Sequence, residues 1–256
     1  MILPPLAWVA TRLGSLVGYL YLRSWPTRNL PFYDHRFDYL EGPSNWYWQE
    51  RGVLGAKTIP SGGKVLDLCC GDGTYSGNYY SVRAGHIDAI DRNPSALRLA
   101  RSRYHAQNVT WIDADVLSDP FPASDYDVVM LFAAIEHFSV KNGTTLLAKI
   151  VNSLKATGTL IGSTPIFAEE GGHNVEHDNE FFSMENLIGF LEPHFGHIDT
   201  WTSDWRGRVD AYFVCSNPKV VPAEKVDGLI AKLEARRSHE QEALPKHPAG
   251  ALSAAR

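Results

Sequence analysis

Few cysteines, no excess of positive charge and no long hydrophobic run limit what this chain can do. Its three cysteines, Cys69, Cys70 and Cys215, form no disulfide framework, and no CxxC pair indicates a zinc or redox site. This usage fits a reducing, cytoplasmic compartment. With a net charge of −5 and a pI near 6.0, the chain has no overall field that would attract phosphate backbones. We therefore expect no nucleic acid partner.

The apolar N-terminal segment is not long enough to cross a membrane. Its uninterrupted run, Leu13–Leu22, is too short to span a bilayer, and the segment does not resemble a signal peptide. Its apolar residues fall at helical spacing, which predicts an amphipathic helix within residues 1–25. We expect this helix to pack on the domain or on a second subunit of a homodimer. Its bulky apolar face and lack of acids also leave open a peripheral contact of residues 1–24 with the inner face of a membrane.

Residues 26–63 and 218–256 flank the regular part of the chain. The first segment is rich in aromatic residues and lacks strand alternation, so we interpret it as a cap of helices or loops. Such a cap could cover a ligand pocket or simply pack against the core. The second segment predicts one short helix around Val226–Leu233, followed by a flexible tail.

Between these segments, strand-like runs alternate with helical ones. The strands are expected at Lys64–Cys69, His86–Asp91, Val109–Ala114, Tyr126–Phe132, Thr159–Thr164, His197–Thr202 and Val209–Ser216, and the helices at Tyr75–Val82, Pro94–Ala106, Gly143–Lys155 and Ser183–Leu191. This pattern predicts an α/β fold over residues 64–217. We expect a Rossmann-like, doubly wound sheet of seven mostly parallel strands with an antiparallel C-terminal strand, preceded by the N-terminal helical extension.

The first of these strands runs directly into a tight turn that contains Gly71 and Gly73. Because glycine has no Cβ, a ligand can approach the main chain closely there. Asp91 ends the next strand, twenty-four residues after Asp67. In a doubly wound sheet its carboxylate lies beside the glycine turn, where it can accept hydrogen bonds from both hydroxyls of a ribose. The two features together predict an adenosine-type ligand.

Five segments in order resemble the motif set of class I S-adenosylmethionine-dependent methyltransferases. They are VLDLCCGDGT (Val65–Thr74), AIDRNP (Ala89–Pro94), IDADVL (Ile112–Leu117), YDVVMLFAAIEHF (Tyr126–Phe138) and LKATGTLIGSTP (Leu154–Pro165). The resemblance is strongest to the small-molecule type, in which the fourth strand leads to Glu-His. It implies S-adenosylmethionine as the cofactor and a small-molecule acceptor such as a sugar. One residue departs from the family, because Cys69 stands where glycine is usual, and the turn could be tighter or displaced there.

The resemblance also implies roles for individual residues. Asp67, Cys69, Gly71 and Gly73 would line the methionine end of the cofactor, Asp91 with Arg92 the ribose, Asp115 and Val116 the adenine, and Phe132 and Ala133 the sulfonium. Each aspartate also has a purely structural interpretation. Asp67 could cap the following turn, Asp91 could cap the next helix, and Asp115 could make local hydrogen bonds at the start of a loop.

Three histidines compete for the role of catalytic base. His137 follows the fourth strand, and the resemblance places it facing the cofactor, where in some sugar methyltransferases it acts as base. His173 and His177 lie in the acidic loop after the fifth strand, which opens at the carboxyl edge of the sheet. Their spacing would suit a metal only on a helix, and Gly171-Gly172 favours a loop. We therefore assign no metal ligands there.

The sequence thus predicts an enzyme that methylates an oxygen of a small-molecule or glycan-like acceptor. A membrane-dissolved quinone or lipid precursor is an alternative acceptor, suggested by the N-terminal helix. A catalytically silent scaffold that binds S-adenosylmethionine is another alternative, suggested by Cys69. A nicotinamide dehydrogenase is disfavoured, because no third fingerprint glycine follows Gly73.

Overall fold

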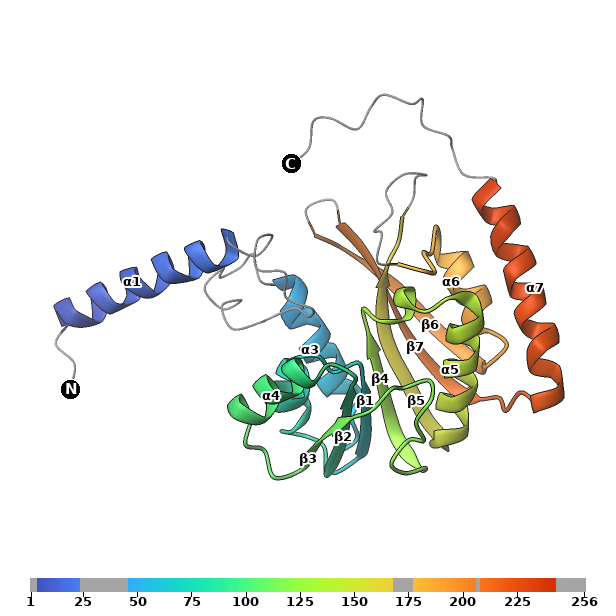
Figure 1. The fold of residues 1–256 in the computed structure, drawn as a ribbon, viewed down its shortest axis with the longest axis horizontal. Helices are drawn as coiled ribbons and strands as arrows, with labels where there is room; N and C mark the ends of the chain where they lie inside the picture. The colour runs from blue at the N-terminus through green and yellow to red at the C-terminus, as the bar shows by residue number, and fades with distance from the viewer. Residues whose placement is uncertain (1–3, 24–45, 168–176, 206–207, 243–256) are drawn as a thin grey trace.

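The computed structural model describes residues 4–23, 46–167, 177–205 and 208–242. Figure 1 shows a central sheet with helices on both faces. The elements follow in the order α1 (Pro4–Arg23), α3 (Trp46–Thr58), β1 (Lys64–Leu68), the π-helical turn η2 (Ser76–Tyr80), β2 (His86–Asp91), α4 (Pro94–Arg103), β3 (Val109–Asp113), β4 (Tyr126–Phe132), the 3-10 turn η3 (Ile135–His137), α5 (Val140–Ser153), β5 (Leu154–Pro165), α6 (Met184–Leu191), β6 (Phe195–Trp205), β7 (Arg208–Pro218) and α7 (Ala223–Glu242).

The seven strands form one sheet in the order β3-β2-β1-β4-β5-β7-β6. β1 pairs in parallel with β2 on one side and β4 on the other, and β7 runs antiparallel to both β5 and β6. The predicted fold class, a mostly parallel doubly wound sheet with an antiparallel C-terminal strand, is confirmed. The strand order reverses direction between β1 and β4, and ligands of such sheets bind at the carboxyl ends of the strands beside that point.

Most expected element boundaries are close to those observed, and the differences have local causes. α5 begins at Val140 rather than Gly143, because the Ser139 side chain accepts a hydrogen bond from the Asn142 N–H and caps the helix. The expected helix Tyr75–Val82 contains the π-helical turn η2 instead. Tyr104 packs so closely on this turn that a Cβ at Gly77 would lie 2.2 Å from its ring. α7 has twenty residues and is therefore much longer than predicted.

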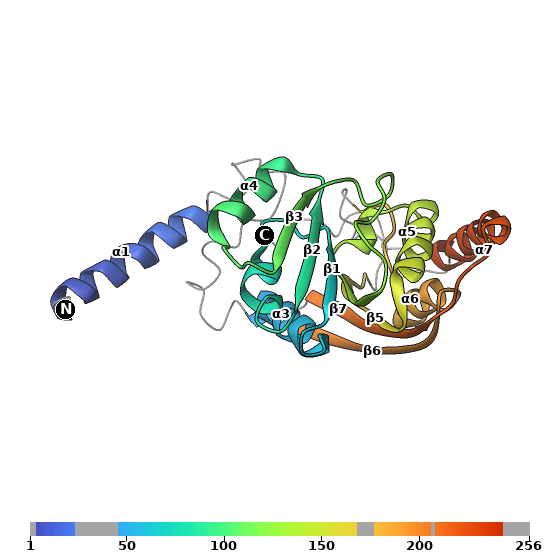
Figure 2. The ribbon, with the colours of Figure 1, turned by 90° about the horizontal axis from the view of Figure 1, so that it is seen from below.

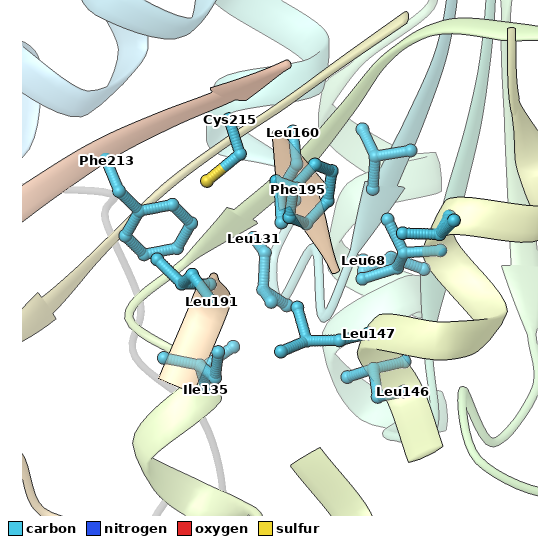
Figure 3. Close-up of a cluster of buried hydrophobic side chains, with 14 of the residues drawn as sticks. Leu68, Leu131, Ile135, Leu146, Leu147, Leu160, Leu191, Phe195, Phe213 and Cys215 are labelled. Carbon is cyan, nitrogen blue, oxygen red and sulfur yellow. The ribbon is translucent and has the colours of Figure 1, made fainter. Parts of the chain in front are cut away.

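The core has two parts, one on each face of the sheet. Alternating residues of β1 separate them, since Leu66 and Leu68 belong to one cluster and Val65 to the other. The first cluster, shown in Figure 3, lies under α5, α6 and α7. The second lies under η2 and α4, with Ile59 from the end of α3. β1, in which Val65, Leu66, Asp67 and Leu68 are all buried, is therefore covered on both faces.

α3 is part of this packed unit. A Cβ at Gly52 would lie 2.7 Å from the ring of Tyr79, and a Cβ at Gly55 would lie 2.5 Å from Tyr80. The two glycines therefore allow α3 to contact η2 closely. Directly before Gly52 on the helix, Arg51 forms an ion pair of 2.7 Å with Asp210 of β7, and both side chains are almost completely buried.

α1 projects away from the sheet and its helices, as Figures 1 and 2 both show. Its large apolar side chains are exposed, with exposed fractions between 44% and 62% for Leu6, Trp8, Val9, Leu13, Leu16, Val17 and Leu20. Among the described residues, no helix is both long enough and apolar enough to cross a membrane.

Candidate functional site

The glycine turn after β1 has the backbone conformation that a close ligand approach requires. Gly71 and Gly73 have φ angles of 56° and 76°, in the left-handed region. A Cβ at Gly73 would lie 2.6 Å from the Trp111 ring, so the turn tolerates only glycine there, whereas a Cβ at Gly71 would meet no heavy atom within 4 Å. The main chain at Gly71 thus faces open space.

Asp91 lies at the carboxyl end of β2, directly beside this turn. Its Oδ2 accepts a hydrogen bond from the Gly71 N–H at 2.8 Å, and its Oδ1 accepts one from the Asn93 N–H at 2.7 Å. Each carboxylate oxygen can accept a second bond. The helix cap of α4 is Asn93 rather than Asp91, since the Asn93 side chain accepts from Ser95 and Ala96. The arrangement fits the ribose of an adenosine cofactor, with two acceptor oxygens next to an accessible main chain.

Asp67 lies beneath the turn. It is buried, and its Oδ2 accepts a hydrogen bond of 2.6 Å from the Ser76 hydroxyl at the start of η2. Burial raises the pKa of Asp67 to about 7, the hydrogen bond from Ser76 opposes the shift, and the nearby carboxylate of Asp91 adds to it. This carboxyl group can therefore change charge near neutral pH when a cation binds.

Cys69 adopts the conformation of the glycine that it replaces. Its φ angle is 58°, in the left-handed region, which costs a residue with a Cβ about 1 to 2 kcal/mol. The turn nevertheless closes, with hydrogen bonds of 3.0 Å from the Cys70 N–H to Ile90 and from the Gly73 N–H to Cys70. Burial raises the pKa of the Cys69 thiol, so the thiol stays protonated.

Asp72 was missed by sequence reasoning, and it holds the turn in place. This buried carboxylate accepts hydrogen bonds from the Thr74 N–H at 3.2 Å and from the Thr74 hydroxyl at 2.9 Å. It also forms an ion pair of 2.9 Å with Arg103 of α4. In a tight turn, an aspartate side chain typically accepts a hydrogen bond from the backbone N–H two residues further along the chain. The position of Asp72 between two turn glycines could therefore have indicated this role.

Asp115, Val116 and Arg92 were expected at the adenine and the ribose, and the structure shows their contacts within the protein. Asp115 makes the local hydrogen bonds of a loop start, because its Oδ1 accepts from the N–H groups of Leu117 at 2.7 Å and Ser118 at 3.3 Å. Val116 is buried in the core cluster under α5. Arg92, expected near the ribose, is exposed beside Asp91. Their contacts with a cofactor stay predictions.

An aromatic cluster lies at the carboxyl end of β4. The ring of Phe132 lies 6.4 Å from the rings of Tyr75 and Tyr212, and Tyr212 stacks on Trp201 of β6 at 5.4 Å. Of these, the sequence singled out Phe132 alone. Tyr75 could have been found from its position directly after the glycine turn, whereas the partners from β6 and β7 depend on strand pairing that the sequence does not reveal.

Two of the three candidate histidines come together. The rings of His137, in η3, and His177 are 4.9 Å apart and nearly perpendicular. His137 is exposed and His177 is partly buried, with its ring 5.6 Å from Phe167. A hydrogen bond of 2.9 Å from the Asn179 N–H to the Glu136 carbonyl holds the two segments together. His173 lies outside the described residues.

Glu136 joins this pair, and sequence reasoning did not place it in the site. The side chain is only 2% exposed, and its Oε2 has no hydrogen-bond partner among the described residues. Burial raises the pKa of Glu136, while the imidazole of His137 and the guanidinium of Arg51 oppose the shift. Ligand atoms of Glu136, His137 and His177 all lie within 4.8 Å of one another.

Comparison with known proteins places this geometry in a family. The family model described as a methyltransferase domain matches residues 65–158. An uncharacterized methyltransferase of Mycobacterium tuberculosis is 29% identical over 96 residues, which cover 38% of this chain and 47% of that protein. A 2-phytyl-1,4-naphtoquinone methyltransferase of Nostoc sp. is 28% identical over 125 residues, covering 46% and 52%. The chain spans about half the length of these curated relatives.

A solved structure supports the fold more broadly. The phosphoethanolamine N-methyltransferase 2 of Haemonchus contortus, in complex with phosphomonomethylethanolamine and S-adenosylhomocysteine, superimposes with a TM-score of 0.55 at 14% identity, over 67% of this chain and 53% of that chain. At this identity the likeness concerns the fold alone. The family match, the strand order and the glycine turn joined to Asp91 agree, and together they support a class I S-adenosylmethionine-dependent methyltransferase domain that includes residues 65–158.

Proposed function

We propose that this protein transfers the methyl group of S-adenosylmethionine to an oxygen of a small-molecule or sugar-like acceptor. The observation that carries this proposal is the meeting of His137 and His177, with their rings 4.9 Å apart, at the carboxyl edge of the sheet where β1 and β2 also end in the glycine turn and Asp91. When bound, the cofactor supplies an electrophilic methyl group. The acceptor must then be aligned with it and must lose its proton.

The chain provides residues for each part of this task. Asp91, with Arg92 beside it, would hold the ribose, and Asp67, Cys69, Gly71 and Gly73 would line the methionine end. Asp115 and Val116 would flank the adenine, and Phe132 would border the methyl group. His137 is exposed, so it can reach an acceptor hydroxyl and take its proton, while the perpendicular ring of His177 packs against it and would orient it.

The test separates cofactor binding from turnover. A screen of candidate acceptors with radiolabelled methyl donor identifies a substrate, and calorimetry with S-adenosylhomocysteine measures cofactor affinity. His137→Ala should lower turnover at least 100-fold and leave that affinity unchanged, because a general base contributes about 10²- to 10⁴-fold. His197→Ala, at an exposed position of β6, is the matched control. A normal rate in His137→Ala eliminates His137 as the base. Cofactor binding without turnover of any acceptor favours a catalytically silent scaffold.

A membrane-dissolved acceptor is a second candidate, which the exposed face of α1 favours. On a helical wheel Leu6, Val9, Leu13, Leu16, Val17 and Leu20 share one side and Thr11 and Ser15 lie opposite. Arg12, which packs over the Trp8 ring, lies at the border between the two sides. The helix has no acidic residue. Such a helix can lie in the surface of a bilayer. The Nostoc relative is named for a phytyl naphthoquinone, which is an acceptor of this kind.

Co-sedimentation with liposomes tests this candidate. The full chain should sediment with anionic vesicles, and removal of residues 1–24 should abolish sedimentation. Leu16→Glu should weaken binding, because it places a charge on the apolar side of α1, whereas Thr11→Glu on the polar side should weaken it less. Equal sedimentation of the full and shortened chains, or none in either, contradicts membrane contact. A full chain that instead elutes as a dimer, and a shortened one that elutes as a monomer, assigns α1 to a homodimer interface.

A further inference from the structure

Glu136, His137 and His177 form a cluster of side chains that can act as metal ligands. Their carboxylate and ring-nitrogen atoms lie within 4.8 Å of one another. We propose that these three side chains bind a divalent first-row transition ion, such as Zn²⁺ or Mn²⁺, at the acceptor end of the site. The sequence had considered a metal only for the pair His173 and His177, so the ligands proposed here are a different set.

The buried carboxylate is the first support for this proposal. Glu136 is 2% exposed and its Oε2 has no hydrogen-bond partner among the described residues. Burial of a carboxylate without full compensation is strongly unfavourable, so such groups are usually paired or coordinate a metal. A dication beside Oε2 would supply this compensation.

The donor set and its exposure are the second support. Two imidazoles and one carboxylate are the ligands of many catalytic metal sites, in which the remaining positions stay open for water or substrate. Glu136 and His177 are at least partly buried and His137 is exposed, so the cluster is closed on the protein side and open toward solvent. An acceptor oxygen can therefore reach the ion.

The surrounding contacts hold the ligands in place. The Asn179 N–H bonds the Glu136 carbonyl at 2.9 Å, which ties the segment after His177 to η3. The Phe167 ring packs against His177 at 5.6 Å, and the carboxylate of Glu180 lies 4.0 Å from its Nδ1.

The role of the ion rests on the proposed methylation of oxygen, although its binding does not. A hydroxyl bound to a dication has a lowered pKa and can release its proton to solvent. The oxygen then forms the new bond to the methyl carbon as the bond from carbon to sulfur breaks, and the sulfur leaves as a neutral thioether. When the ion is bound, His137 is one of its ligands. The ion, rather than His137, then activates the acceptor hydroxyl.

Binding of the metal alone is the direct test. The untagged full chain is treated with a chelator, dialysed and titrated with MnCl₂ and ZnCl₂ by calorimetry, and bound Mn²⁺ is counted by electron paramagnetic resonance. We expect one ion per chain with micromolar affinity. Glu136→Gln and His177→Ala should each weaken binding at least tenfold, whereas His197→Ala, an exposed histidine of β6, should bind as the wild type does.

The affinity for S-adenosylhomocysteine and the thermal unfolding temperature show whether each variant is folded. If Glu136→Gln is unstable, His177→Ala still tests metal binding. Absence of a bound ion, or binding that neither substitution weakens, overturns the proposal. Turnover that survives chelation overturns the role of the ion but leaves the proposed methylation intact. An ion that binds while no acceptor is methylated contradicts the proposed function instead.

Discussion

The carboxylate of Asp91 accepts a hydrogen bond of 2.8 Å from the backbone N–H of Gly71. This bond joins the end of β2 to the turn that follows β1, so it fixes the separation of the two parts of the proposed cofactor site before any ligand binds. Each carboxylate oxygen of Asp91 accepts one backbone hydrogen bond and can accept a second from a ligand. A site arranged in this way binds its ligand with little reorganisation.

Replacing Asp91 should therefore abolish cofactor binding. In Asp91→Ala we expect the affinity for S-adenosylhomocysteine to fall at least 100-fold, because two hydrogen bonds to a charged acceptor are lost at about 1.5 to 3 kcal/mol each. Asp199→Ala, at an exposed position of β6, is the control. Calorimetry measures both. An affinity within a few-fold of the wild type would show that Asp91 does not hold the ribose.

The affinity for S-adenosylhomocysteine should depend on pH through Asp67. Burial raises the pKa of Asp67 to about 7 in the free protein, and an ammonium group at the methionine end favours the ionised carboxylate. The dissociation constant should fall by up to about tenfold per pH unit as the pH rises toward 7 and then level off. Asp67→Asn should remove this dependence. The same slope in the variant would mean that another group is responsible.

Alanine substitutions at the two turn glycines should have different effects. In Gly73→Ala the new methyl group meets the Trp111 ring at 2.6 Å in addition to the strain of a positive φ, so urea unfolding should show a loss of about 2 to 4 kcal/mol. In Gly71→Ala only the strain applies, about 1 to 2 kcal/mol, but the methyl group extends into the open space beside Asp91. We expect this variant to remain folded and to bind S-adenosylhomocysteine weakly. Equal stability losses in both variants would contradict the described turn.

A buried histidine should make stability fall in acid. His194 is fully buried, neither ring nitrogen has a hydrogen-bond partner among the described residues, and burial lowers its pKa to about 4. Between pH 6.5 and 4 the unfolded chain therefore binds a proton that the native state does not. The stability contributed by this group is present above pH 6.5 and is lost toward pH 4, by about 3 kcal/mol.

The pH dependence of stability must be compared between the wild type and a His194 variant, because Asp67 changes stability with pH in the opposite direction to His194. Its raised pKa costs stability as the pH rises from 4 to 7, so the two effects partly cancel in the wild type. We expect His194→Leu to lose less stability than the wild type on acidification, as measured by urea unfolding at several pH values. His105→Leu, at an exposed position, should follow the wild type. A His194→Leu curve parallel to that of the wild type contradicts the assignment.

Local patterns were sufficient for the sheet and for the placement of Asp91. The predicted strands His86–Asp91 and Tyr126–Phe132 match the observed strands residue for residue, and each has a run of four consecutive buried residues, as expected of a strand that is covered on both faces. The turn beside Asp91 follows from chain topology, which places the ends of neighbouring parallel strands at one edge.

Contacts between distant segments were not predictable in the same way. His137 and His177 are forty residues apart, and their meeting depends on the course of the chain after β5. The π-helical turn η2 packs against Tyr104, which follows the end of α4 and lies 27 residues after Gly77. The sequence presented Glu136 as part of a motif, and only the structure shows that it is buried and that its Oε2 has no hydrogen-bond partner among the described residues. Each of these three features depends on tertiary packing, which cannot be read from the periodicity of the sequence.

The ion pair between Arg51 and Asp210 limits how this protein can be divided. It joins residues 159 positions apart, on either side of the segment that matches the methyltransferase family. Excising residues 64–217 as an independent catalytic core would take Arg51 away from a carboxylate that is completely buried, and breaking such a pair costs about 3 to 5 kcal/mol. The smallest autonomous folding unit therefore has to begin no later than α3, well upstream of the first cofactor motif.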